Sequence, residues 1–349
     1  MNLVIKMRKT TKIVKIGNKL IGGNNPILIQ SMTNIKTSKT DLVINQIKEL
    51  EENGCDIIRV SVLDMDDAKA IKIIKENINI PLVADIHFDY KLAIASIESG
   101  ADKIRLNPGN IENIDHIKEV VNLCKEKHIP IRIGVNEGSL PKDLDLSPEN
   151  MVKALKRHID ILESLDFKDI CISLKANDIN LCVESYKLAS SMYDYPMHIG
   201  ITEAGLEYSG LVKSSIGLGI LLYEGIGDTI RVSLASNPVK EVIAAKEILS
   251  NFNLYDKPTL TVCPTCGRTE YDLIPIATKI NEYIKTIKKP LKLAVMGCIV
   301  NGIGEAKYAD LAICGGKGCG VIISHGETIK KVSEDKLYDE FIKELNKLI

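Results

Sequence analysis

From about residue 26 to residue 250, short apolar runs with a strand-like period alternate with longer stretches of helical period. This alternation favours parallel strands joined by helices, and eight strands in roughly 225 residues favour a TIM (β/α)8 barrel in the α/β class. A doubly wound open sheet is the alternative. We predict strands at Pro26–Asn34, Ile57–Val62, Pro81–His87, Lys103–Asn107, Ile131–Asn136, Ile170–Lys175, Met197–Thr202 and Thr229–Leu234.

The segment Asn251–Pro258 ends the last helical pattern of this region and predicts a domain boundary. We therefore expect a barrel domain over residues 1–252 and a smaller α+β domain over residues 258–349. The pattern of the second domain predicts a turn at Cys263–Cys266, helices at Thr269–Ile287 and from Glu334 to the end, and strands at Leu291–Met296, Asp310–Cys314 and Val321–Ser324.

The predicted barrel strands carry polar side chains on one face. In Ile57–Val62, for example, Arg59 and Ser61 share a face while Ile58 and Val60 share the other. Because the apolar face of a barrel strand packs against the outer helices, the polar face should point into the barrel or its C-terminal mouth. The same argument predicts a ligand site formed by Arg59, Asp85, His87, Arg105, Asn107, Arg132, Asn136, Lys175, Arg231 and Ser233.

Five of these side chains are cationic, and together inside a barrel they would repel one another and lose hydration. An anionic ligand such as a diphosphate would offset both costs, because arginine matches phosphate oxygens bidentately. The alternative is that one or two of the arginines pair with Asp85 or Glu203. Glu203 should lie in the loop at the barrel rim, either as a proton donor or base, or in a plain ion pair with a neighbouring arginine.

The second domain carries a Cys-x-x-Cys pair, Cys263 and Cys266, followed by Cys298 and by Glu305 in the loop N301-G-I-G-E305. Three thiolates and one carboxylate fit an iron–sulfur cluster whose fourth position holds a hard, displaceable ligand. Such a cluster can do chemistry on a substrate as well as carry electrons.

Two other interpretations of these cysteines remain open on the residues alone. Four thiolates from Cys263, Cys266, Cys314 and Cys319 could form a structural zinc site, which would make the second domain an interaction module on a phosphate-binding barrel. Alternatively, the Cys-x-x-Cys pair could be a thioredoxin-like redox motif, which leaves Cys298 and Glu305 unexplained.

Composition narrows the functional class further. The net charge of the 349 residues is −1, which gives no indication of nucleic-acid or membrane-surface binding. The chain has no apolar stretch of about 18 residues and no apolar signal-peptide core near its start. We therefore expect a cytoplasmic protein whose nine cysteines are thiols or metal ligands.

The ordered set of motifs resembles one family, the 4-hydroxy-3-methylbut-2-en-1-yl diphosphate synthases of the methylerythritol phosphate route to isoprenoids. The resemblance covers nearly the whole chain. The matching blocks are Gln30–Asn34, Ile58–Val62, Val83–His87, Lys103–Asn110, Ile131–Asn136, Ile172–Lys175, His198–Gly205, Cys263–Arg268 and Cys298–Glu305.

This resemblance implies a TIM barrel followed by a cluster domain similar to those of sulfite and nitrite reductases, and the substrate 2-C-methyl-D-erythritol 2,4-cyclodiphosphate. It implies an acid pair at Thr202 and Glu203 and a 4Fe–4S cluster whose carboxylate ligand is Glu305. The thiolate ligands and the anion-binding residues implied by the family fall on Cys263, Cys266, Cys298, Arg59, Arg105, Arg132, Lys175 and Ser233.

The resemblance also implies a head-to-tail homodimer in which the partner's cluster domain caps each barrel mouth. Electrons should come from ferredoxin or flavodoxin, because no G-x-G-x-x-G nucleotide motif follows a predicted strand. One position departs from the family pattern N-G-P-G-E: Ile303 replaces the proline, whose fixed φ would stiffen the loop before Glu305.

Overall fold

The computed structural model describes residues 7–298, 302, 304 and 306–349. The chain forms two compact units, of which the first ends at Leu254 and the second begins at Tyr255. This division falls inside the segment Asn251–Pro258, where the sequence predicts the boundary. Each unit is described below by itself.

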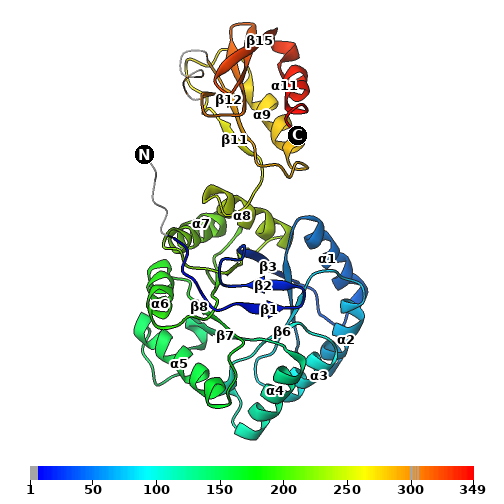
Figure 1. The fold of residues 1–349 in the computed structure, drawn as a ribbon, viewed down its shortest axis with the longest axis vertical. Helices are drawn as coiled ribbons and strands as arrows, with labels where there is room; N and C mark the ends of the chain where they lie inside the picture. The colour runs from blue at the N-terminus through cyan, green and yellow to red at the C-terminus, as the bar shows by residue number, and fades with distance from the viewer. Residues whose placement is uncertain (1–6, 299–301, 303, 305) are drawn as a thin grey trace. The chain divides into compact units, whose positions relative to one another are not determined.

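The first unit is a barrel of parallel strands surrounded by helices (Figure 1). The strand order is β8-β7-β6-β5-β4-β3-β10-β9, and a parallel bridge between Ile172 and Met197 joins the two end strands. The TIM-barrel prediction is therefore confirmed, and the open doubly wound sheet is wrong. The strands are β3 (Leu28–Met32), β4 (Ile57–Ser61), β5 (Leu82–Asp85), β6 (Lys103–Arg105), β7 (Ile131–Asn136), β8 (Ile170–Lys175), β9 (His198–Ile199) and β10 (Thr229–Ile230).

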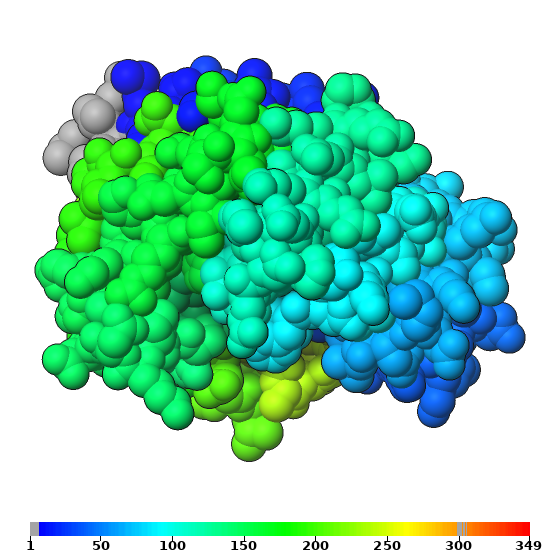
Figure 2. Space-filling view, turned by 90° about the horizontal axis from the view of Figure 1, so that it is seen from below, coloured from blue at the N-terminus to red at the C-terminus, as the bar shows by residue number. Residues whose placement is uncertain are grey.

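Eight helices cover the outside of this barrel, and Figure 2 shows side chains of the cyan-to-green segments forming a continuous layer on one side. Several helices begin with an Asp, Asn or Ser side chain that accepts a hydrogen bond from a first-turn N–H, as Asp64 does from Asp67. The helices are α1 (Thr40–Glu52), α2 (Met65–Lys75), α3 (Tyr90–Glu98), α4 (Ile114–Lys127), α5 (Pro148–Ser164), α6 (Ile179–Met192), α7 (Glu207–Tyr223) and α8 (Pro238–Asn251).

The barrel strands place apolar side chains outward and polar side chains inward. On β4, Ile58 and Val60 are fully buried in the hydrophobic core, while Arg59 lines an internal cavity. The same alternation on β7 buries Ile133 while Arg132 faces the cavity. The predicted phase of the strands is thus confirmed.

An antiparallel hairpin that the sequence pattern did not reveal precedes the barrel: β1 (Val14–Ile16) and β2 (Lys19–Ile21), which lie across the barrel in Figure 1. Its apolar side chains pack against residues at the beginnings of barrel strands, including Leu28 and Ile57. The hairpin therefore closes the N-terminal end of the barrel.

The second unit is a five-stranded sheet with helices, and it confirms the predicted α+β class for residues after the boundary. Three parallel strands, β11 (Thr259–Val262), β12 (Lys292–Met296) and β13 (Leu311–Gly316), continue into the antiparallel β14 (Cys319–Ser324) and β15 (Glu327–Ser333). The fully described helices of this unit are α9 (Leu273–Ile284) and α11 (Leu337–Leu345), and the 3₁₀ turn η3 (Glu334–Lys336) precedes α11. Two further 3₁₀ turns, η1 (Pro108–Asn110) and η2 (Glu137–Ser139), belong to the first unit.

Two apolar clusters hold this unit together. The larger combines side chains of α9, α11 and the sheet, among them Ile280, Phe341 and Ile313. The smaller contains Met296 and Cys314 and lies on the alternate residues of β12 and β13. β11 and β15 were not predicted, because their outer positions are exposed and carry little apolar pattern.

Across the described residues, no helix combines the length and the apolar character that crossing a membrane requires.

Candidate active site

A polar cavity of about 370 Å³, including the part that opens to solvent, lies in the barrel. Most of the predicted ligand residues line it, and two further residues, Gly134 and Ser173, complete the wall. The predicted residues in its lining are Arg59, Arg105, Arg132, Asn136, Lys175, Thr202, Arg231 and Ser233.

Asp85 on β5 lies between two of the arginines. Its carboxylate is 3.7 Å from Arg59 Nε and 3.6 Å from Arg105 Nη1. Burial opposes ionisation of Asp85, but the positive charges of Arg59 and Arg105 outweigh it and hold the pKa of Asp85 below its usual value. Burial also lowers the pKa of Arg59 to about 9, which Asp85 only partly offsets. The prediction that one or two arginines pair internally is confirmed for these two.

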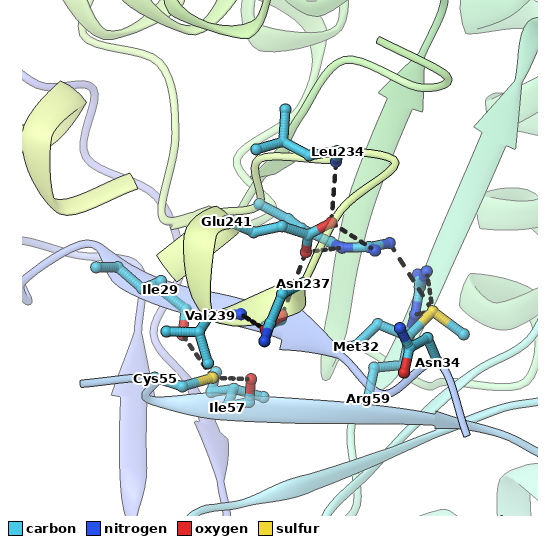
Figure 3. A network of polar contacts seen from close by, with 12 residues as sticks. Ile29, Met32, Asn34, Cys55, Ile57, Arg59, Leu234, Asn237, Val239 and Glu241 are labelled. Atoms are coloured by element: carbon cyan, nitrogen blue, oxygen red, sulfur yellow. Dashed lines mark hydrogen bonds and ion pairs between the residues drawn. The ribbon is translucent and has the colours of Figure 1, made fainter. Parts of the chain in front are cut away.

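Arg231 has a different counter-charge, Glu241 in the first turn of α8. Arg231 Nε is 3.4 Å from Glu241 Oε2, and the other carboxylate oxygen accepts a hydrogen bond from the Leu234 N–H (Figure 3). Met32 on β3 lies between Arg231 and Arg59. Its Sδ is 3.0 Å from Arg59 Nε and 3.8 Å from Arg231 Nη1. The sequence analysis missed both Glu241 and Met32.

Among the described residues, neither Arg132 nor Lys175 forms an ion pair of this kind with a carboxylate. In the described part of the chain, Arg132 Nε and Nη1 are buried without a hydrogen-bond partner. Lys175 Nζ is 3.2 Å from Nε2 of His198, whose Nδ1 is 2.8 Å from Thr229 Oγ1. Burial lowers the pKa of Lys175 and holds the pKa of His198 well below 6.5, so the imidazole beside Lys175 is neutral.

The cavity therefore has a strong excess of positive charge. Asp85 and Glu241 can balance two of the five cationic side chains around it, which leaves three without a counter-charge among the residues just described. Desolvated cations of this kind are stabilised by a multivalent anion that reaches several of them at once. The geometry fits a diphosphate better than a neutral or singly charged ligand.

Thr202 and Glu203 lie in the loop between β9 and α7. Thr202 lines the cavity, whereas Glu203 is exposed and adopts a left-handed backbone with φ of 50°. The Asn177 side-chain amide fixes this conformation by donating a 2.6 Å hydrogen bond to the Glu203 carbonyl oxygen. A non-glycine residue in this conformation at a cavity mouth is a strained position of the kind that clusters at active sites.

Three predicted ligand residues do not line the cavity. Asp85 serves as the counter-charge described above, and the His87 side chain is 53% exposed beside it, with Nε2 4.0 Å from the Asp85 carboxylate. The amide of Asn107 both accepts from and donates to the backbone of Gly134, at 2.9 and 2.8 Å. Asn107 thus holds β7 in place, a use of its side chain that a strand pattern does not reveal.

In the second unit, the predicted cysteine ligands come from one edge of the sheet. Cys263 directly follows β11 and donates its N–H to Val295 on the adjacent parallel strand β12, while Cys298 follows the end of β12. Cys266 is exposed, and hydrogen bonding from Arg268, chiefly from its backbone, lowers the pKa of its thiol. Two neighbouring strand ends and an adjacent turn therefore present three thiols that suit a cluster. Glu305 and Ile303 lie outside the described residues.

The four-cysteine zinc alternative does not fit this sheet. Cys314 on β13 lies in register with Met296 on β12, so β12 lies between it and Cys263, which follows β11. Within residues 7–298, 302, 304 and 306–349, no group of three or more His, Cys, Asp or Glu side chains is placed to hold a single metal ion.

The thioredoxin-like interpretation also lacks its structural context. In such proteins the low pKa of the reactive cysteine depends on a helix N-terminus. Here α9 begins only at Leu273, seven residues after Cys266.

The two units match two domain families in sequence. Residues 11–246 match the GcpE TIM-barrel domain, and residues 259–347 match the GcpE protein C-terminal domain. The chain belongs to the GcpE family. The resemblance expected from the motifs is confirmed, because the curated relatives of this chain carry the name 4-hydroxy-3-methylbut-2-en-1-yl diphosphate synthase (flavodoxin).

One such GcpE relative, from Caldanaerobacter subterraneus subsp. tengcongensis, is 56% identical over 352 residues, covering 99% of each chain. Another, from Clostridium perfringens, is 54% identical and covers 96% of this chain and 98% of its own. Among solved structures, dihydropteroate synthase from Xanthomonas albilineans in complex with 7,8-dihydropteroate superposes with a TM-score of 0.53 over 69% of this chain and 97% of its own. At 12% sequence identity this likeness shows the fold alone.

Proposed function

We propose that this chain catalyses the reductive ring opening of 2-C-methyl-D-erythritol 2,4-cyclodiphosphate to 4-hydroxy-3-methylbut-2-en-1-yl diphosphate in isoprenoid biosynthesis. The reaction takes up two electrons and two protons and releases one water as the ring C–O bond breaks. The observation that carries this proposal is the 56% identity to a relative of that name over 99% of both chains. The excess positive charge of the barrel cavity supports it independently.

The proposal includes a 4Fe–4S cluster held by Cys263, Cys266, Cys298 and Glu305. The supporting observations are the two cysteines at adjacent ends of β11 and β12 and the lowered pKa of Cys266, since a cluster binds thiolates. When bound, the cluster supplies the two electrons of the reduction one at a time.

The barrel residues hold the substrate and handle charge. Arg59, Arg132 and Arg231 donate to the diphosphate oxygens and stabilise the negative charge that develops on the leaving oxygen. Thr202 and Ser233 supply hydroxyl groups at the cavity wall and orient the substrate. Glu203, on the loop that carries Thr202, delivers a proton to the departing hydroxyl group.

The electron donor in this proposal is flavodoxin, as the names of the relatives state for those proteins. Ferredoxin is the second candidate, because it offers the same low-potential chemistry. Thiols that hold a cluster, among them the exposed Cys266, need a reducing compartment, so we place the protein in the cytoplasm.

We also propose a head-to-tail homodimer, for which α7 offers a surface. Its exposed side carries apolar residues at helical spacing, from Tyr208, which is 82% exposed, through Ile216 and Ile220 to Tyr223. The ammonium group of Lys213, which is also on α7, donates a 2.8 Å hydrogen bond to Asn177 Oδ1 and so points away from this apolar side. An uncharged apolar stripe on a helix can pack on its own copy across a two-fold axis.

Anaerobic purification with iron, sulfide and zinc analysis tests the cofactor. The proposal predicts about four iron and four sulfide per chain and a broad visible absorption band that bleaches with dithionite. About one zinc without iron or colour would instead support a phosphate-binding barrel with a structural metal domain.

A further inference from the structure

Lys103 on β6 lies inside the barrel, one side-chain layer below the cavity. It precedes Arg105 by two residues on the same strand, so both side chains point to the barrel interior. Its register partner on β5 is Val83, which belongs to the apolar cluster at the closed end of the barrel together with Cys171. Lys103 thus lies between that apolar floor and the cations that line the cavity.

The ammonium group of Lys103 is fully buried and has no hydrogen-bond partner among the described residues. A buried lysine without a partner is costly, because it loses hydration and gains nothing in return. Above it, the guanidinium of Arg132 also has two unpartnered nitrogens, Nε and Nη1. Lys103 therefore lies beneath the cavity and Arg132 lies in its wall, and among the described residues neither forms an ion pair with a carboxylate; only the more distant charge of Asp85 acts on Arg132.

The groups that act on Lys103 come from four other strands. Arg59 on β4 and Arg132 on β7 are cations, His198 on β9 is a neutral imidazole, and Cys171 on β8 is a weak acid. Burial lowers the pKa of Lys103 from 10.5 to about 8; the potential charge of Cys171 acts against this shift, whereas Arg132 and Arg59 reinforce it. Burial also raises the pKa of Cys171, so that thiol remains neutral near pH 8 and is no counter-ion.

We propose that Lys103 is a sixth cation of the diphosphate site, a positioning residue that strengthens anion binding from below without touching the ligand. This inference rests on the function proposed above, since it needs an anion in the cavity. An anion held by Arg132 and Arg59 would supply the counter-charge that Lys103 lacks and would favour its protonated form. Binding would then take up part of a proton at Lys103.

The test is calorimetric titration of inorganic pyrophosphate into the full chain at pH 8, repeated in buffers of different ionisation enthalpy to count protons. The variant is Lys103→Met, which keeps the volume and removes the charge, and the control is Lys69→Met on the exposed side of α2. Pyrophosphate itself exchanges the same number of protons with every variant, so the difference in proton uptake between variants reports on Lys103. Thermal unfolding of each variant checks that it is folded.

We expect Lys103→Met to take up fewer protons than the wild type on binding at pH 8, because burial lowers the pKa of Lys103 and leaves part of the lysines neutral before the anion binds. At pH 7 the affinity of Lys103→Met for pyrophosphate should be about tenfold weaker than that of the wild type, because the variant lacks one positive charge about 10 Å from the anion. Its melting temperature should not fall, since a buried unpartnered charge is lost. The control should match the wild type.

Unchanged affinity and proton uptake in a folded Lys103→Met variant would overturn this inference and leave the proposed function intact. If the wild type itself does not bind pyrophosphate, the anion site of the proposed function fails and the role of Lys103 fails with it. Because the anion-binding residues named above all lie in the barrel, neither outcome requires a loaded cluster.

Discussion

The polar positions of individual residues were the most predictable part of the candidate site. A two-residue period placed Arg59, Arg105 and Arg132 on one face, and the structure brings all three to one cavity. The counter-charge Glu241 was not predictable in this way, because it comes from a helix whose other acidic residue, Glu247, is exposed. Its position in the first turn of the helix that follows the predicted strand Thr229–Leu234, which carries Arg231, is the signal that could have revealed it.

Replacing Asp85 by Asn tests whether this carboxylate offsets the arginines. We expect a loss of about 3 kcal/mol in the free energy of unfolding at pH 7, because two buried guanidinium groups lose their shared partner. The pKa of Asp85 is lowered in the folded state. The contribution of the Asp85 carboxylate to stability is therefore fully present above pH 3.8, its ordinary pKa, and is lost as the pH falls below that value toward the lower pKa of the folded state.

Urea unfolding at pH 7 and at pH 3 measures this effect. The variant and the wild type should differ at pH 7 and converge at the lower pH. Asp143→Asn serves as the control, because Asp143 forms an exposed pair with Arg157 and should matter little. Equal stability of Asp85→Asn and the wild type at pH 7 would show that the arginines do not depend on Asp85.

Replacing Glu203 by Gln tests the proposed proton donor. We expect turnover to fall about 100-fold, because a carboxamide cannot deliver the proton, while pyrophosphate affinity and cluster absorbance stay unchanged. Glu207→Gln is the control, since this exposed carboxylate near the same loop pairs with Lys240 instead. Full turnover of the Glu203 variant would remove Glu203 from the mechanism.

At the scale of elements, the alternation of strands and helices was predictable, but strand lengths were not. β9 and β10 have two residues each, whereas the strands predicted there, Met197–Thr202 and Thr229–Leu234, have six residues each. The polar residues after them, such as Thr202 and Ser233, continue the strand pattern in sequence but lie in loops at the cavity. The β1–β2 hairpin escaped prediction because its three-residue strands are too short to show a period.

The hairpin provides a stability test that should leave the site untouched. Ile16 is fully buried on β1, so we expect Ile16→Ala to cost about 2 to 4 kcal/mol in the free energy of unfolding. The pyrophosphate affinity of Ile16→Ala should stay within about twofold of the wild-type value, because the cavity lies toward the opposite end of the barrel strands. Lys15→Ala, at the exposed neighbouring position, is the control.

Urea unfolding and calorimetric titration together check this prediction. If Ile16→Ala is as stable as Lys15→Ala, the hairpin does not seal the barrel. If it weakens pyrophosphate binding as strongly as it weakens folding, the hairpin and the cavity are coupled.

At the scale of the whole molecule, the sequence predicted two domains, and the structure has two units that each hold their own apolar core. Motif order was the most informative signal, because it identified a family that the comparisons confirm over both units. Apolar surface that remains exposed in a single chain cannot be read from the sequence, since a helical period alone does not show which side of α7 meets the barrel.

The α7 face leads to a prediction about assembly. We expect the wild type to be a dimer and Ile220→Glu to be a monomer, because a charge in the middle of an apolar interface loses its hydration on association. Size-exclusion chromatography with light scattering measures both masses. Leu42→Glu, at an exposed position of α1, should remain dimeric. A dimeric Ile220→Glu variant would show that another surface mediates assembly.

The most direct test of the central claim is turnover by the anaerobically purified chain. The reaction contains 2-C-methyl-D-erythritol 2,4-cyclodiphosphate and reduced flavodoxin, and mass spectrometry identifies the product. Our account predicts 4-hydroxy-3-methylbut-2-en-1-yl diphosphate, with two electrons consumed per molecule, and no product from Cys298→Ala. A cluster-loaded wild type that binds the cyclodiphosphate and returns it unchanged would contradict the account.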